Sequence, residues 1–435
     1  MTISAGLSSY RDHVHRNSVF VVLAPFVVAS LTVTPFYIDA FANTSHAASG
    51  PATEFKMQAV NGAPYGVHTA VRVLTFTNSQ YSLAIDLANH EVDGGLETPS
   101  SMCRSMVGCV AAVNGDYYDV TRRGQPDSGD AVGGIIQNCV LLHTPEISHQ
   151  QANLVGEQVG ESLNWSVSVD VDGDTVPITA VNQELPMKYP DVNLPLTGNL
   201  LFTTPFDLQT PSAAGRLTYE FIQVNTTTSP TTSTTPSSTT STTSSPTTST
   251  TTSPTTSTTL GSTTSALSPT AINTSTELEL VAQTTNAVRV RAGHVDISAP
   301  TRSSFASLQI GDTVTMTTTS TAGCNNIGGH PILLNDGAVV PTSAADTFMS
   351  QKYARTVIGW TASGETIVMV VAGTDDKSGA TGHQLVRLLQ ALDVVTALNL
   401  DGGDSTSLYV KGRIDYHAGR GERPVSTALL VVQNQ

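Results

Sequence analysis

The sequence predicts an α/β fold of the α+β kind, and three observations lead to this class. Two long segments are rich in short β-branched or alternating apolar runs, which is the pattern of β-strands. One segment near the C-terminus has apolar residues at helical spacing and leads into a run with the composition of a buried strand. Between the strand-rich segments lies a tract of Thr, Ser and Pro that has nothing to bury.

The first strands are expected at residues 71–76 and 81–87, with the turn residues Thr77-Asn78-Ser79 between them. Residues 165–171 alternate between apolar and polar, turn at Asp172-Gly173, and resume at residues 175–178. This second arrangement predicts a β-hairpin.

Another hairpin is expected from residues 356–360 and 366–372. A helix follows, in which Thr381 can cap the N-terminus and Gln384, three residues on, can complete a capping box. The helix leads into residues 394–400, which have the composition of a buried strand.

The tract of residues 226–265 is almost wholly Thr and Ser with periodic Pro. Such a segment cannot offset the entropy cost of ordering its backbone. We therefore expect residues 225–276 to be a disordered insertion, with a composition that resembles an O-glycosylated stalk.

The composition limits the partners of the protein. The chain has 435 residues, 39% of them hydrophobic, and a net charge of −15. Binding to nucleic acid depends on Lys and Arg displacing counterions, so an acidic chain is a poor candidate for it. A small phosphate-bearing substrate is still compatible, because one or two well-placed arginines can hold it.

The N-terminus has the pattern of an export signal. Arg11 and Arg16 form a basic region, residues 18–38 are mainly apolar, and small residues follow around Ala48. We expect residues 1–48 to be a cleaved signal peptide and the protein to be secreted or held at the cell surface. An uncleaved membrane anchor is the alternative, since the apolar run is nearly long enough to span a bilayer.

Four cysteines, an even number, suggest two disulfides in an exported chain. None of the four lies in a C-x-x-C pair, which disfavours a zinc or redox motif. Three connectivities are open. The pairing of Cys103 with Cys109 and of Cys139 with Cys324 is favoured because the first two cysteines are close in the sequence. Free buried thiols are the alternative.

Polar residues gather at the end of the apolar strand expected at residues 394–400. Asn399 and Asp401 are two residues apart and so share one face of the strand, and Gly402 and Gly403 permit close approach of a ligand to the backbone. The next residues add donors and acceptors: Asp404, Ser405 and Thr406. A tight turn with Asx-type hydrogen bonds explains these residue types equally well, but the density of polar groups after a buried strand favours a site.

Residues 111–119 repeat this arrangement. A short apolar strand ends in Asn114-Gly115, and two carboxylates and two aromatic rings follow: Asp116, Tyr117, Tyr118 and Asp119. The rings could stack on a sugar, and either carboxylate could position or protonate it. A hairpin turn with surface tyrosines is the alternative, because Asn-Gly is a strong turn signal.

Two further residues are candidates because of their context. His330 lies between a glycine pair and Pro331, where it could act as an acid, a base or a ligand, although a lone histidine is often structural. Arg355 begins an apolar strand and could grip a phosphate; its alternative role is an ion pair at a surface or interface. The chain lacks the Gly-x-Ser-x-Gly elbow, the Walker loop and the His-Glu-x-x-His motif, which disfavours serine esterases, nucleotide-dependent enzymes and zinc proteases.

These motifs resemble those of the phosphodiester glycosidase family. The resemblance rests on Asn399-Leu400-Asp401-Gly402-Gly403, on residues 355–359 and on residues 113–119, supported in the same order by residues 329–333 and 423–428. It covers most of residues 67–432, with the Thr/Ser tract as an insertion.

The resemblance implies one mixed-sheet α/β domain made of residues 55–224 and 277–435. It also implies cleavage of a sugar-1-phosphodiester between the anomeric carbon and the phosphate oxygen. The chain departs from the family where it has Asp404, because the family usually has a third glycine there.

On this basis we expect Asp401 to be the base or nucleophile, with a partner among Asp116, Asp119 and Glu422, while Arg355 holds the phosphate. The residues expected to bind substrate are Asn114, Tyr118, His330, Arg355, Asn399, Gly402, Gly403, Asp404, Ser405, Thr406 and Arg423. We expect a sugar-phosphate or glycan substrate and no cofactor. Two other readings are a glycan-binding protein without turnover and a phosphodiesterase that uses a divalent cation on Asp401 and Asp404.

Overall fold

The structure is a computed structural model that describes residues 55–435 except 93, 119–128, 130, 146–149, 184–197, 205–209, 211–213, 229–271, 322, 342–346 and 374–377. The expected signal peptide, Asp119 and most of the Thr/Ser tract lie outside the described residues. Gly50–Gln435 form one compact unit. None of the described helices is long and apolar enough to cross a membrane.

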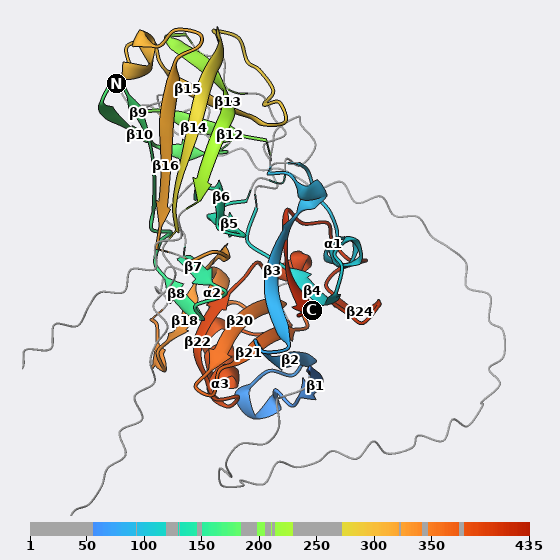
Figure 1. Cartoon of the computed structure of the whole chain (residues 1–435). Coiled ribbons are helices and arrows are strands. Elements are labelled where there is room, and N and C mark those ends of the chain that lie inside the picture. Colours follow the sequence, from blue (N-terminus) through green and yellow to red (C-terminus); the bar gives the residue numbers. More distant parts are fainter. Residues whose placement is uncertain are drawn as a thin grey trace, which may run out of the picture. The chain divides into compact units, whose positions relative to one another are not determined.

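The described strands form four sheets (Figure 1), so the prediction of a single mixed α/β sheet is wrong. Their strands pair antiparallel except for β11 with β12, and helices are few and short. The predicted helix and the buried strand after it both exist, but that strand pairs antiparallel on each side. A helix followed by a strand therefore does not here make the parallel crossover that defines α/β folds.

The seven-stranded sheet carries the helix that the sequence predicts. Its strands, in spatial order, are β1 (Lys56–Val60), β2 (Val71–Thr77), β21 (Glu365–Val371), β20 (Arg355–Thr361), β22 (Val394–Asn399), β18 (Ile332–Asn335) and β19 (Ala338–Val339). The helix α3 (Gly382–Gln390) begins with the expected Thr381–Gln384 capping box, which is confirmed. Its apolar face packs on the sheet through side chains such as Leu385 and Leu389.

One five-stranded sheet shares a core with the seven-stranded sheet. Its order is β24 (Arg413–His417), β23 (Ser407–Val410), β4 (Cys109–Asn114), β25 (Thr427–Gln433) and β3 (Tyr81–Leu87). Ile85, Val113 and Leu429 from this sheet lie in the same apolar cluster as Ile358 and Leu398 from the other. The ends of β4 and β22, where the polar motifs lie, are therefore brought to a common region.

The other five-stranded sheet is made of short strands: β6 (Val140–His143), β5 (Ile135–Gln137), β17 (Asn326–Gly329), β7 (Gln150–Asn153) and β8 (Gln158–Gly160). The remaining described helices are α1 (Pro99–Ser105), α2 (Thr347–Ser350) and the 3-10 turns η1 (Ala63–Tyr65), η2 (Ala88–His90), η3 (Ser304–Ser307) and η5 (Gly403–Ser405). The favoured disulfides, Cys103–Cys109 and Cys139–Cys324, are both formed, so this pairing is confirmed.

The eight-stranded sheet contains the Thr/Ser insertion point. Its order is β10 (Asp174–Ile178), β9 (Trp165–Val171), β16 (Thr313–Ser320), β14 (Ile272–Thr284), β13 (Arg216–Thr228), β15 (His294–Pro300), β12 (Leu200–Thr203) and β11 (Ala180–Val181). The predicted hairpin at Asp172-Gly173 is confirmed. Because β13 and β14 pair with each other, both strands continue into residues 225–276, the range that the sequence assigns to the insertion.

A buried carboxyl group marks this sheet. Asp296 on β15 is 1% exposed, and neither carboxylate oxygen has a hydrogen-bond partner among the residues that the structure describes. Its cross-strand neighbour Glu220 is paired with Arg291 and His294. Burial, followed by repulsion from Glu220 and partly offset by Arg291, raises the pKa of Asp296 from 3.8 to about 7.

We therefore predict that Asp296 makes the protein less stable as pH rises from about 4 to about 7. The folded state holds the Asp296 proton more tightly than the unfolded chain does. The stability that this difference provides is fully present at pH values below the pKa of the unfolded chain, and it is lost as the pH rises through the pKa of the folded state. At about 1.4 kcal/mol per pKa unit the loss is on the order of 4 kcal/mol. Chemical denaturation at several pH values should show this slope, and Asp296→Asn should flatten it.

The matched control is Asp174→Asn, because Asp174 is an exposed aspartate on β10 of the same sheet. It should keep the slope of the unmodified protein. An unchanged slope in Asp296→Asn would contradict the prediction.

Candidate active site

Asp401 follows β22 and is held by the backbone around it. The Asp401 amide donates to the Gly115 carbonyl (3.1 Å), and the Gly403 amide donates to the Ala354 carbonyl (2.9 Å). The Asp401 side chain is half-buried, and its Oδ1 accepts a hydrogen bond from the Gly402 amide (2.8 Å). The carboxyl group is thus fixed in position while part of the residue stays open to solvent.

The surroundings of Asp401 raise the pKa of its carboxyl group above the usual value. Burial raises the pKa of Asp401 from 3.8 to about 6, and the charge of Asp116 adds to this effect. Hydrogen bonds from Ser405 and Gly402 and the charge of Arg423 lower the pKa in part. A carboxyl group of this pKa exchanges protons near neutral pH, as general acid–base catalysis requires.

Asn114 joins three parts of the chain at the end of β4. It is fully buried, and its Nδ2 donates to the Asp401 carbonyl (2.7 Å). Its Oδ1 accepts hydrogen bonds from the Thr356 hydroxyl on β20 (2.6 Å) and the Ser407 amide at β23 (3.3 Å). The predicted site residue Asn114 is therefore close to Asp401, where it positions the backbone.

Asp116 is also close to Asp401, but its carboxylate is enclosed. The residue is 1% exposed, and its oxygens accept from the Tyr117 amide (2.7 Å) and the Gly133 amide (2.8 Å). Gly328 leaves the space for it, because a Cβ at that position would lie 2.1 Å from Oδ2. Its charge acts on Asp401, so Asp116 can tune that carboxyl group without reaching the substrate itself.

Asn399 and His330 meet at the ends of β22 and β17. The Asn399 Nδ2 donates to the Tyr117 hydroxyl (2.9 Å) and to the His330 carbonyl (2.7 Å), while the exposed His330 contributes its backbone to this network. The Asn399 Oδ1 is buried and has no hydrogen-bond partner among the described residues.

Other buried polar atoms near these strand ends also have no hydrogen-bond partner in the described part of the chain: Thr406 Oγ1, Ser407 Oγ and Ser426 Oγ. An unsatisfied buried polar group costs about 1–3 kcal/mol, so native proteins hold few of them away from functional sites. Such atoms also occur elsewhere in the described part of the chain, at Asp296 in the eight-stranded sheet and at Trp360 in the seven-stranded sheet.

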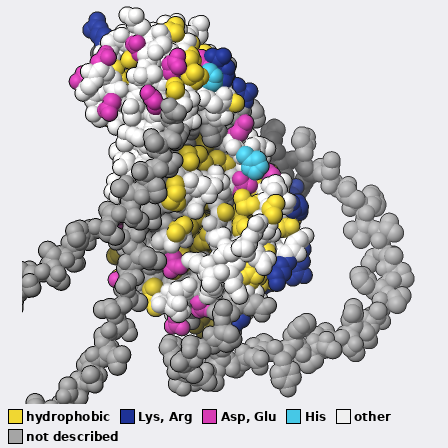
Figure 2. Space-filling view, in the orientation of Figure 1, with side chains coloured by type: hydrophobic (Ala, Val, Ile, Leu, Met, Phe, Trp, Pro, Cys, Tyr) yellow, Lys and Arg dark blue, Asp and Glu magenta, His cyan; other side chains and the backbone are white. Residues whose placement is uncertain are grey.

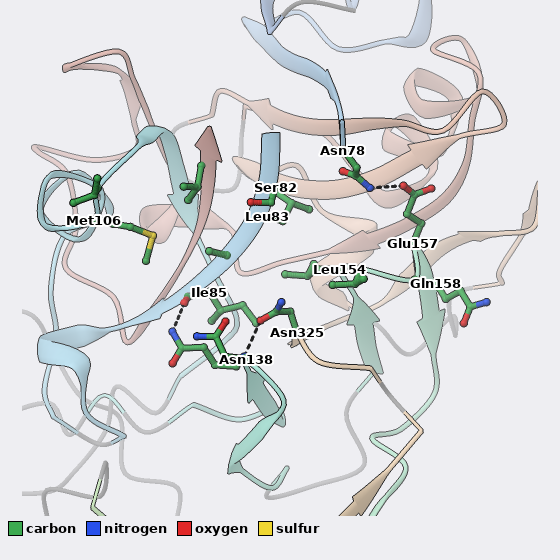
Figure 3. Close-up of a pocket in the computed structure, with 16 residues that line it drawn as sticks. Asn78, Ser82, Leu83, Ile85, Met106, Asn138, Leu154, Glu157, Gln158 and Asn325 are labelled. Atoms are coloured by element: carbon green, nitrogen blue, oxygen red, sulfur yellow. Dashed lines mark hydrogen bonds between the residues drawn. The ribbon is translucent and has the colours of Figure 1, made fainter. Parts of the chain in front are cut away.

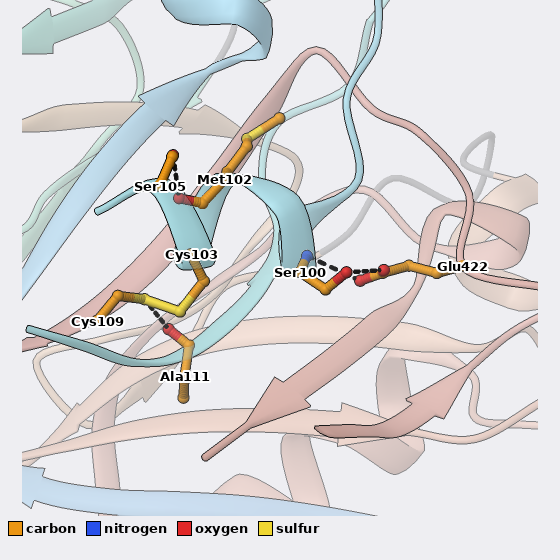
Figure 4. The surroundings of a disulfide bond; sticks show 7 residues. All are labelled: Ser100, Met102, Cys103, Ser105, Cys109, Ala111 and Glu422. Carbon is orange, nitrogen blue, oxygen red and sulfur yellow. Dashed lines mark hydrogen bonds between the residues drawn. A yellow bond between two sulfur atoms is a disulfide. The ribbon is translucent and has the colours of Figure 1, made fainter. Parts of the chain in front are cut away.

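The loop before β25 brings Arg423 to the cluster and holds Glu422 away from it. The Glu422 carboxylate accepts from the Ser100 amide (3.0 Å) and the Ser100 hydroxyl at the start of α1 (Figure 4). Arg423 lies 5.7 Å from the centre of the Tyr118 ring, and the Tyr118 hydroxyl donates to the Pro424 carbonyl (3.1 Å). Glu422 and the 7%-exposed Tyr118 therefore anchor the loop, and their expected roles as a catalytic partner and a substrate contact stay predictions.

Arg355 lies at the start of β20. Its side chain is fully buried, and the guanidinium group donates to the carbonyls of Ala380 (3.0 Å) and Gln351 (3.0 Å). Side chains alternate along β20, so the neighbouring Thr356 faces Asn114 while Arg355 points to the opposite face. These contacts hold the backbone, and the expected grip of Arg355 on a phosphate stays a prediction.

The glycine turn has the backbone geometry that the motif predicts. Gly403 has φ of +58°, a conformation that residues with a Cβ rarely adopt, and Gly402 is buried beside Asp401. Asp404 is exposed, whereas Ser405 is buried and hydrogen-bonds Asp401. Asp119 lies outside the described residues.

The sequence motifs missed Thr427 as part of this region. Its Oγ1 accepts from the Asp116 amide (3.0 Å), and its carbonyl accepts from the Gly115 amide (2.8 Å). Thr427 lies in the segment 423–428 that supports the resemblance, but it stands at the start of an apolar strand, whereas Asn114 and Asn399 stand at the ends of theirs. Among the described residues, no three His, Cys, Asp or Glu side chains are arranged to hold a metal ion.

One protein-family model matches part of this chain. Residues 252–432 match the model of the phosphodiester glycosidase (NAGPA) family. The resemblance drawn from the sequence is confirmed. The matched segment contains Asn399, Asp401 and Arg423, whereas Asn114 and Asp116 precede it. No curated protein sequence matches the chain.

Two solved structures share the fold at low sequence identity, and a third is similar at a lower TM-score. A hypothetical protein from Synechocystis has a TM-score of 0.60 and 17% identity over 87% of this chain and 62% of its own length. A candidate exported protein from Burkholderia pseudomallei has a TM-score of 0.56 and 14% identity over 84% and 74%. The catalytic domain of zebrafish N-acetylglucosamine-1-phosphodiester α-N-acetylglucosaminidase, auto-inhibited by its pro-peptide, has a TM-score of 0.39 and 13% identity over 89% and 85%. The chain thus spans less than two thirds of the Synechocystis protein.

We predict that Asn114→Ala destabilises the protein by about 3 kcal/mol, because it leaves buried partners on three chain segments without hydrogen bonds. Urea denaturation measures the change. The control Asn273→Ala alters an asparagine on β14 of the eight-stranded sheet and should have little effect. Equal stabilities of the two variants would contradict a joining role for Asn114.

Proposed function

We propose that this protein is an exported glycoside hydrolase that cleaves the bond between the anomeric carbon of a sugar and the oxygen of a phosphodiester. The observation that carries the proposal is Asp401, whose pKa is raised to about 6 by its surroundings and which lies in the segment that matches the phosphodiester glycosidase family. Export is supported by two disulfides and by the signal-like N-terminus.

The proposed reaction depends more on an ionised carboxylate, acting as base or nucleophile, than on a general acid that protonates the leaving group. The ionised Asp401 either removes a proton from water or attacks the anomeric carbon itself, and the carbon–oxygen bond breaks with its electron pair going to the phosphate. The phosphate is a good leaving group. Once its bond to the sugar breaks, the former phosphodiester departs as a phosphomonoester. Water supplies the oxygen that ends on the sugar.

Arg423 is the cation best placed to meet the phosphate. Its charge lowers the pKa of Asp401, so the two groups interact across the site. Arginine binds phosphate oxygens in pairs and can stabilise the charge that develops as the bond breaks. This assigns to Arg423 the phosphate contact that the sequence suggested for Arg355.

The proposed role of Asp116 is electrostatic. Its negative charge raises the pKa of Asp401, while its own oxygens bind the Tyr117 and Gly133 amides. The exposed Asp404 adds a negative charge at the turn, which disfavours phosphate monoesters because they carry more charge than diesters.

The first test is hydrolysis of a sugar-1-phosphodiester in ¹⁸O-labelled water, with the products analysed by mass spectrometry. Cleavage at the anomeric carbon places the label in the sugar. We expect Asp401→Asn to lower kcat by about 10³-fold, in the range of acid–base and nucleophilic groups. The exposed Asp336→Asn serves as the control and should retain the activity. Label in the phosphate, or full activity in Asp401→Asn, would refute the proposal.

The second test is the pH dependence of kcat/KM. A carboxylate that must be ionised gives activity that rises with pH through about 6 and then levels off. Arg423→Gln removes a cation that lowers the pKa of Asp401, so its inflection should move to higher pH. Asp116→Asn removes a charge that raises this pKa, so its inflection should move to lower pH. Shifts in the opposite directions would exclude Asp401 as the titrating group.

A further inference from the structure

The strand β3 is the free edge of its sheet. Among the described residues it pairs only with β25, from Tyr81 opposite Gln433 to Leu87 opposite Thr427. Edge strands present unpaired main-chain donors and acceptors, and proteins usually cover them or use them. The edge of β3 lies below the surface, because Leu83 is 6% exposed and Ile85 is 0% exposed.

The register shows which groups of β3 face outward. The Asn434 amide donates a hydrogen bond to the Gln80 carbonyl. In this register, the main-chain N–H and C=O groups of the even-numbered residues of β3 point towards β25, and those of the odd-numbered residues point away from it. Two contacts on the other side agree, because the Gln137 side chain donates to the Ile85 carbonyl (2.7 Å) and the Leu87 amide donates to the Asp86 side chain (3.0 Å). Side chains thus take the place of a neighbouring strand at Ile85 and Leu87, whereas Leu83 has no such contact.

A groove of about 870 Å³ runs along this edge (Figure 3). Four consecutive residues of β3, Ser82 to Ile85, line it, so the groove follows the backbone edge and not one face of the strand. Met106 lies on one side of β3, and Leu154 and Glu157 of the β7–β8 turn lie on the other. This volume is in the range of known ligand sites.

The groove is apolar and slightly acidic. Val107 and Val155 at its sides are 80% and 62% exposed, and hydrophobic side chains gather at the surface over β3 in Figure 2. Glu157, which accepts a hydrogen bond from Asn78 (2.5 Å), is the only charged residue among those that line it. Burial raises the pKa of Glu157, so a cation nearby would stabilise its charged form.

From this juxtaposition we propose that the groove binds an extended peptide as an additional strand on β3, with a basic side chain against Glu157. The peptide forms main-chain hydrogen bonds with Leu83 and Ile85 and displaces the Gln137 side chain from the Ile85 carbonyl. Strand addition is a common mode of peptide recognition, in which the backbone supplies affinity and the flanking pockets supply specificity. Apolar residues of the peptide cover Val107 and Val155.

The recessed position of β3 selects this occupant over a second copy of the chain. Walls on both sides of the edge admit a single extended strand, whereas the β3 of another copy is recessed between walls of its own. A phosphate-bearing ligand is disfavoured because no Lys or Arg lines the groove.

The test measures binding of a fluorescein-labelled peptide, Thr-Val-Lys-Val-Thr-Val, to the purified protein by fluorescence anisotropy. The same peptide with N-methyl groups on alternate amides should bind at least tenfold more weakly, because it cannot complete the ladder. Hydrogen exchange adds a residue-level readout. The amides of Leu83 and Ile85 should become protected on binding by at least tenfold, while those of Ser82 and Ala84, already paired with β25, should not change.

Two variants locate the site. Glu157→Lys should weaken binding at least tenfold by opposing the basic residue, and Val155→Asp should weaken it by removing apolar contact. The matched control is Val140→Asp, since Val140 is 56% exposed on β6 and lies outside the groove. It should bind as the unmodified protein does.

Equal binding of the normal and N-methylated peptides, or equal binding by Val155→Asp and Val140→Asp, would overturn the proposal. So would the absence of peptide binding together with binding of a neutral hexasaccharide that Val155→Asp abolishes, because the groove would then be a sugar site. None of these results depends on whether the protein hydrolyses phosphodiesters.

Discussion

The side-chain amide of Asn114 is the interaction on which the candidate active site depends. It links the end of β4 to Thr356 on β20, to Ser407 at β23 and to the backbone of Asp401. These partners are more than 240 positions away in the sequence; the contacts with Thr356 and Ser407 are buried, and the contact with Asp401 is partly buried. A hydrogen bond is stronger in such a low-dielectric environment, and losing one partner there is correspondingly costly. The position of Asp401 is therefore set by the meeting of two sheets, and its own loop contributes only the final turn.

The same enclosure gives Asp401 its chemistry and a cost in stability. Burial favours the protonated carboxyl group, so the folded protein gives up the Asp401 proton at a higher pH than the unfolded chain does, and ionising this group for the proposed reaction lowers the stability of the fold. Ser405 and Gly402 offset part of this penalty through hydrogen bonds to the carboxylate. Asp116 acts in the opposite direction, and its enclosure by the Tyr117 and Gly133 amides keeps its negative charge close to Asp401.

Local features of the fold could be predicted from the sequence, and those that depend on distant partners could not. The capping box at Thr381 and the hairpin at Asp172-Gly173 involve neighbouring residues, so the residue types alone determine them. The arrangement of the sheets depends on pairing between strands that are far apart in the sequence. A helix followed by a buried strand therefore predicts an α/β fold that the strand pairing does not form. Arg355 shows the same limit within the site. Its position in the motif was visible, but the direction of its side chain follows from the contact of Thr356 with Asn114.

The candidate active site and the groove along β3 belong to the same sheet but are separated by a continuous ladder. β25 pairs with β3 on one side and with β4 on the other, and it carries Thr427, which accepts a hydrogen bond from the Asp116 amide. A peptide added to β3 would extend this ladder without changing the pairs already formed. Coupling between two sites requires an element with two arrangements that both sites favour differently, and a strand paired along both edges offers one arrangement. Binding of a peptide in the groove should therefore hold the protein on a partner without altering the protonation of Asp401.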